Sequence, residues 1–167
     1  MNARLLLCVV ILLSGCPRVE GVDVSAAREF YRQPTSVQQK TFRQHSLEDQ
    51  LGLFFFGNQV RHPPAIYLAD CFALNGAPAV ELLRSKLEVA NDDLTVRDIV
   101  TLLATIDEMG QYDVAGDDRL MLALKTRAAQ MKDKGWRDLA QEYIAKIGHE
   151  RSERAGVAPE CGRLNLR

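Results

Sequence analysis

The sequence has no apolar run long enough to span a bilayer and no excess of either charge. Its longest run of apolar residues, 5–13, has nine members, whereas a membrane-spanning helix needs about 20. Lys and Arg number 21 against 22 for Asp and Glu, so the formal net charge is −1. Because both signs are interspersed along the chain, nothing indicates a nucleic-acid partner.

Catalytic and metal-binding motifs are also missing. The sequence has no Gly-x-Ser-x-Gly nucleophile turn and no glycine-rich phosphate loop. His45, His62 and His149 never occur at zinc-ligand spacing, and the acidic segment 111–118 lacks the alternating oxygen ligands of a calcium-binding loop. We therefore expect a protein that is not an enzyme and that has no metal and no cofactor. A site assembled from distant residues would escape these patterns.

One motif is present, at the N-terminus. Arg4 provides a basic start, and the apolar run 5–13 has the length of the hydrophobic region of a secretory signal. The sequence Leu-Ser-Gly-Cys, ending at Cys16, follows directly. This arrangement resembles the lipobox of bacterial lipoproteins, in which small residues stand immediately before a cysteine.

The resemblance implies that residues 1–15 are a signal peptide and that Cys16, once acylated, is the first residue of the mature chain. Two acyl chains suffice for stable membrane anchoring, so Cys16 would hold the protein permanently on a membrane. Pro17 stands where lipoproteins retained in the inner membrane carry aspartate, which favours the cell outer membrane, facing the periplasm. The alternatives are an ordinary secretory signal cut nearby and an uncleaved anchor.

Four cysteines are present, and two of them remain after processing. Cys8 leaves with the signal and Cys16 carries lipid, so Cys71 and Cys161 are left in a compartment where disulfides form. A bond between them would close a loop of about 90 residues. The alternative is that Cys71 is a small core residue and Cys161 a free thiol in the tail.

The rest of the chain is typical of a helical domain. We expect a lipidated tether at 16–34, a helical domain at 35–148 and a charged, largely mobile tail at 149–167. Apolar residues recur at helical spacing, and no stretch shows the alternation of a strand. The fold class is therefore all-α, with five to six helices that form either an irregular bundle or a short stack of antiparallel helical hairpins. The stack would weakly resemble HEAT-type repeats.

Two helix boundaries are predicted from local signals in the middle of the chain. The segment 66–74 is apolar around most of its circumference, so we expect a central helix that begins at Pro63 and Pro64. A short link to the next helix predicts that the two pair as an antiparallel hairpin. Further on, Thr95 and Asp98 mark the predicted start of another helix.

A polar segment joins two strongly apolar helices and contains most of the candidate binding residues. Asn58, Arg61 and His62 lie in this link, and Tyr67 and Asp70 follow at a spacing that shares one helix face. Since a buried acid needs a partner, we expect Asp70 to accept from Arg61 or His62. The arrangement is either a pocket for a small ligand or an internal ion pair that holds the link.

Tyr112 is a further candidate, since it sits beside a short turn and aromatic residues are enriched at protein interfaces. It is either exposed for recognition or packed under its loop. The leading hypothesis is a non-enzymatic helical lipoprotein that contacts an unidentified envelope protein in the periplasm. The alternative is a small-ligand-binding lipoprotein that uses the region around Arg61 and Asp70.

Overall fold

The computed structural model describes residues 23–149 and residue 161. Within this part of the chain there are eight α-helices, one short 3-10 helix and no strand. The all-α class is confirmed, while the helix count exceeds the five to six expected. The elements are α1 (Val24–Arg32), α2 (Thr35–Phe42), α3 (Leu47–Gln59), η1 (Ile66–Leu68), α4 (Ala69–Ala73), α5 (Ala77–Val89), α6 (Asp93–Glu108), α7 (Asp118–Gln130) and α8 (Lys134–Lys146).

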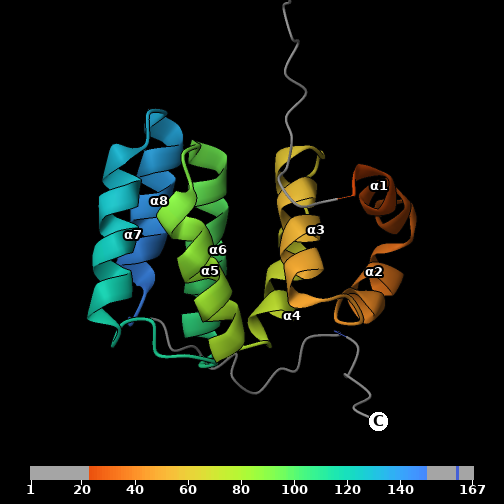
Figure 1. The fold of residues 1–167 in the computed structure, drawn as a ribbon, viewed down its shortest axis with the longest axis horizontal. Coiled ribbons are helices and arrows are strands. Elements are labelled where there is room, and N and C mark those ends of the chain that lie inside the picture. Colours follow the sequence, from red (N-terminus) through yellow and green to blue (C-terminus); the bar gives the residue numbers. More distant parts are fainter. Residues whose placement is uncertain (1–22, 150–160, 162–167) are drawn as a thin grey trace, which may run out of the picture.

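The helices form two groups that meet at α4 and α6. Helices α5 to α8 lie side by side on one side of the molecule, α1 to α3 form the other, and α4 bridges them at the base (Figure 1). Helix α6 packs against α3, α4, α5, α7 and α8. It accordingly has the most enclosed face, with Ile99, Leu102, Leu103 and Ile106 fully buried. The predicted signal peptide, Cys16 and all of the tail except His149 and Cys161 lie outside the described residues.

The helical domain begins about ten residues earlier than the sequence predicted. Residues 24–32 were assigned to the tether, but they form α1, whose first turn is capped by Asp23 through the amides of Ser25 and Ala26. Phe30 and Tyr31 are buried, and the Tyr31 hydroxyl donates to the Leu53 carbonyl at 2.8 Å. Helix α1 is therefore part of the core and leaves the tether shorter.

The predicted central helix from Pro63 to 74 is much shorter than expected. A proline has no amide hydrogen and disfavours helical backbone in the residue before it, so the chain does not become helical at Pro63 and Pro64. The Ala65 amide donates instead to the Gly57 carbonyl, and helical structure begins with η1 at Ile66. Helix α4 packs mainly against α6, so the predicted α4–α5 hairpin is wrong.

Helix α6 starts earlier than its predicted signals. Asp92, not a residue at 95–98, is the N-cap and accepts from the Thr95 amide at 2.8 Å. Asp98 consequently lies in the second turn, where it is buried. The sequence signal was misread because an aspartate one turn inside a helix has the same local pattern as a cap.

Cys71 and Cys161 form a disulfide in the structure. Their Cα atoms are 5.3 Å apart, within the range that a bridge requires. The bond joins α4 to a buried residue 90 positions further along the chain. Cys161 is therefore attached to the base of the helical domain. It is not the free thiol that the alternative interpretation of the sequence predicted.

Candidate interaction surfaces

Four polar side chains near α1 gather in one cluster, which we call the corner cluster: Tyr31, Gln38, Arg61 and Tyr67. The Arg61 guanidinium carbon lies 4.6 Å from the centre of the Tyr31 ring. The Tyr67 hydroxyl donates to the side-chain oxygen of Gln38, whose amide nitrogen donates in turn to the Gln33 carbonyl at 2.6 Å. The cluster thus ties the link after α3 to α1 and α2.

Gly57 makes this arrangement possible. A Cβ atom at this position would lie 2.1 Å from the Tyr31 hydroxyl and 2.6 Å from the Ala65 Cβ. Burial raises the pKa of Tyr31 above its usual range, so the hydroxyl stays protonated and keeps donating to Leu53. The close contact of α1, α3 and the link is therefore specified by one small residue.

Asp70 is not part of the corner cluster, contrary to the prediction. It is exposed in the first turn of α4, and no ion pair joins it to Arg61 or His62. Because α4 begins only at Ala69, its core-facing positions are taken by apolar neighbours and position 70 faces outward. His62 is exposed as well, while Asn58 is buried with no hydrogen-bond partner for its Oδ1.

Tyr112 belongs to a different site at the base of the molecule. Its hydroxyl donates to Asp117 at 2.9 Å, and Arg84 donates to the same carboxylate oxygen at 2.5 Å. The hydrogen bond from Arg84 lowers the pKa of Asp117 to about 2, with help from the Leu120 amide that Asp117 caps. Tyr112 therefore holds the loop before α7, beside an open hollow of about 490 Å³.

Two buried acids were missed by the sequence analysis. Asp98, 1% exposed, accepts from Gln59 at 3.0 Å and from two nitrogens of Arg97 at 2.6 and 2.9 Å. Asp107 accepts from backbone amides in the loop after α6 and at the end of α8. The sequence did contain a signal that Asp98 is buried, because Asp98 lies one helical turn before the buried Leu102 and so shares its face of the helix.

The Asp98 cluster extends to the surface through an aromatic contact. Arg97 also stacks on Trp136, with its guanidinium carbon 4.5 Å from the ring centre. Trp136 is 37% exposed. Burial raises the pKa of Asp98 to about 6, an effect that the charge of Arg97 opposes.

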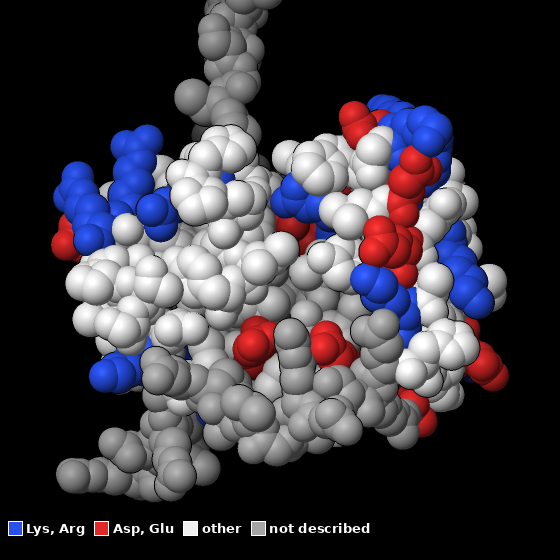
Figure 2. All heavy atoms as spheres, turned by 180° about the vertical axis from the view of Figure 1, so that it is seen from behind, with Lys and Arg blue, Asp and Glu red and all other residues white. Residues whose placement is uncertain are grey.

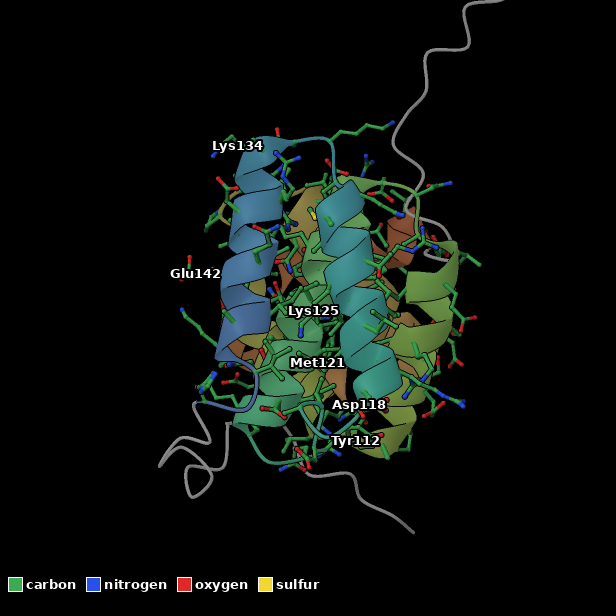
Figure 3. All side chains as sticks on the ribbon, turned by 90° about the vertical axis from the view of Figure 1, so that its left-hand side faces the viewer. Tyr112, Asp118, Met121, Lys125, Lys134 and Glu142 are labelled. Carbon is green, nitrogen blue, oxygen red and sulfur yellow. A yellow bond between two sulfur atoms is a disulfide. The ribbon has the colours of Figure 1, made fainter. Side chains whose placement is uncertain are left out.

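A further hollow lies between α7 and α8 on the outer side of the molecule (Figure 3). This α7–α8 groove has a volume of about 390 Å³ and is open to solvent. Its lining contains no carboxylate: Met121, Lys125, Ala128, Gln141, Ile144, Ala145, Ile147 and His149. Figure 3 shows Met121 and Lys125 at the seam between the two helices, with Glu142 on the far edge of α8. Leu122, next to the groove, is 68% exposed.

The described residues contain no group of three or more His, Cys, Asp or Glu side chains placed to hold a metal ion. In the same part of the chain, no helix combines the length and the apolar character needed to cross a membrane. No family model, no curated protein and no solved structure matches this chain.

Proposed function

We propose that the protein is a lipid-anchored, non-enzymatic protein of the cell outer membrane that binds an envelope protein through the α7–α8 groove. The anchor is proposed from the lipobox that ends at Cys16. The observation that supports partner binding is the open apolar groove, whose floor combines Met121, Ala128 and Ile144. Methionine adapts its shape to different partners, and surfaces of this kind are common in binding proteins.

The chemistry of the groove favours one kind of partner. The groove between the adjacent helices α7 and α8 can hold the apolar side of an amphipathic helix of the partner. Lys125 and His149 are the only ionisable side chains in the lining, so acidic residues beside that apolar side would be favoured. The helical domain, as an irregular bundle of helices, would serve as the rigid support of this surface.

The small-ligand alternative has less support. It required Arg61 and Asp70 to converge, whereas Arg61 lies on Tyr31 and Asp70 is exposed on α4. The corner cluster instead uses its polar groups to join helices.

Photo-crosslinking in intact envelopes tests the proposal. Benzoylphenylalanine replaces Lys125 in the groove or, as a matched control, Lys134 at the start of α8 (Figure 3). We expect a discrete protein adduct from position 125 and none from position 134. Identical adduct patterns from the two positions, or no adduct from 125, would contradict the proposed groove.

A charge placed in the groove should abolish that adduct. Ala145 is exposed and lines the groove, whereas Ala129 is exposed on α7 outside it. Ala145→Glu should eliminate the adduct and Ala129→Glu should keep it, with equal melting temperatures. The anchor is tested separately, since a clickable fatty acid should label the wild-type chain and leave Cys16→Ala unlabelled.

A further inference from the structure

One face of the α1–α3 side of the molecule has a broad uncharged area (Figure 2). Figure 2 shows this side on the left as a broad neutral area, with basic side chains at its edge. Pro34 and Thr35 at the start of α2, and Pro63, Pro64 and Ile66 in the link up to η1, are exposed and uncharged, and we call these five residues together the neutral face. Ile66 is 54% exposed, the highest fraction of any large apolar residue in this half of the molecule.

Tyr67 holds the two parts of the neutral face together. Its hydroxyl contacts Gln38 and its side chain is hydrogen-bonded to Thr35, both on α2. The neighbouring Ile66 and the two prolines are therefore carried by a fixed loop beside α2. Prolines and an isoleucine that are exposed and held in place form a surface suited to contact with an apolar environment or a membrane interface.

The charges on α1 and α2 beside this face are mostly basic, whereas Asp70 on α4 is an exposed acid near its other border. Between residues 24 and 43 there are four basic residues and a single acid, Glu29, in a chain whose net charge is −1. Glu29 is paired with Arg32 at 3.0 Å, which leaves Arg28 and Lys40 exposed on α1 and α2. Positive charge beside an apolar surface is complementary to anionic lipid headgroups.

The length of the chain places this side nearest to the proposed anchor. Six residues lie between Cys16 and Asp23, the cap of α1, so the two can be at most about 25 Å apart. Helix α1 extends roughly a further 10 Å from its start to Tyr31, which belongs to the corner cluster. Acyl chains on Cys16 would thus keep the α1–α3 side close to the membrane.

We infer that the neutral face and its basic edge rest on the lipid headgroups of the membrane that holds Cys16. This inference rests on the proposed lipid anchor. The α7–α8 groove lies on the opposite side of the molecule from α1 and α2, so it points away from the bilayer toward a partner (Figure 1). The anchor and the partner surface would then act at opposite sides of one rigid domain.

Fluorescence quenching by brominated lipids tests this orientation. The lipidated full-length protein is placed in vesicles of phosphatidylethanolamine and phosphatidylglycerol in equal parts, with Trp136→Phe removing the one native tryptophan. Ile66→Trp reports on the neutral face, and Leu122→Trp, at an exposed position on α7, is the matched control. Brominated acyl chains should remove most of the emission of Ile66→Trp and leave that of Leu122→Trp unchanged.

The basic edge is tested in the same vesicles. Arg28→Gln together with Lys40→Gln should weaken the quenching of Ile66→Trp, while Lys125→Gln together with Lys134→Gln should not. All variants must keep the wild-type melting temperature. Equal sensitivity to both pairs would show that the effect is general charge attraction and would overturn the assigned face.

The remaining outcomes separate this inference from the anchor. Protein that floats with the vesicles but shows no quenching at position 66 overturns the inference and leaves the anchor intact. If position 66 is also shielded from aqueous acrylamide, a second copy or another protein covers the face, and the bilayer contact is again wrong. Protein that neither floats nor takes up a fatty acid label disproves the anchor itself, and the membrane contact falls with it.

Discussion

Asp98 is the residue whose charge state should most affect stability near neutral pH. Burial raises its pKa to about 6, above the value of about 3.9 in an unfolded chain. The folded protein therefore holds this proton more tightly than the unfolded chain does. The contribution of protonated Asp98 to the free energy of unfolding is full below about pH 3.9 and is lost as pH rises through 6. We expect the free energy of unfolding of wild type, relative to Asp98→Asn, to fall between pH 4 and pH 7 in urea denaturation.

A pH-independent difference between these two proteins would contradict the prediction. Asp70→Asn is the control, because Asp70 is exposed and accepts no hydrogen bond within the described chain. Its free energy of unfolding should stay close to that of the wild type.

Gly57 shows how one residue controls the contact between helices. Gly57→Ala places a Cβ atom against the Tyr31 ring and Ala65, so we expect a loss of about 1–3 kcal/mol from overpacking. Gly135→Ala on α8 is the matched control, since its nearest atom is the Asp133 carboxylate at 3.2 Å. Thermal unfolding should show a clear decrease for position 57 and little change for position 135; equal shifts would be inconsistent with the contact.

At the scale of secondary-structure elements, Asp107 joins the ends of α6 and α8. It accepts from the amides of Val114 at 3.0 Å, Ala115 at 3.3 Å and Gly148 at 2.8 Å. Asp107→Asn keeps the shape but exchanges one acceptor oxygen for a donor, so at least one buried amide loses its partner. We expect a loss of about 1–3 kcal/mol and faster hydrogen exchange at Gly148 or Val114.

The control for this change is Asp138→Asn, which removes only an exposed ion pair with Lys134. Exposed pairs contribute about 0.2–1 kcal/mol, so the exchange of Gly148 should stay as in the wild type. Unchanged exchange in Asp107→Asn would mean that the carboxylate is not what holds the two elements together.

At the scale of the whole molecule, the disulfide connects the base of the core with the C-terminal part of the chain. Replacing Cys71 and Cys161 by alanine should lower the free energy of unfolding by about 4–5 kcal/mol, since the bond closes a loop of 90 residues. Wild-type protein purified without reductant should resist alkylation until it is reduced. Two thiols that react freely without reductant would contradict the bond.

The arrangement of the two surfaces also belongs to this scale. The neutral face lies on the α1–α3 side and the α7–α8 groove on the other side (Figure 1). Helix α6 contacts both helix groups. A change in one surface should therefore leave the other intact. This separation is what allows the quenching and crosslinking experiments to be interpreted independently.

Local patterns predicted several elements well, because caps and periodicity act within a few residues. Ser46 caps α3 and Asp117 caps α7, each through a backbone amide three residues further along, so both helix starts depend on local sequence. Short elements escaped prediction for the same reason. Helix α2 has only two buried residues, Gln38 and Phe42, and so carries almost no apolar period.

The sequence by itself determined the helical class, and it predicts a lipid anchor at Cys16 and two thiols left for pairing. Only the tertiary structure decided which polar residues are enclosed, because burial depends on the helices packed around a side chain. Asp70 and Asp98 are both acids beside apolar residues in the sequence, yet the first faces solvent and the second is covered by α3 and α6. The groove between α7 and α8 likewise exists only once the two helices lie side by side, since neither helix alone encloses it.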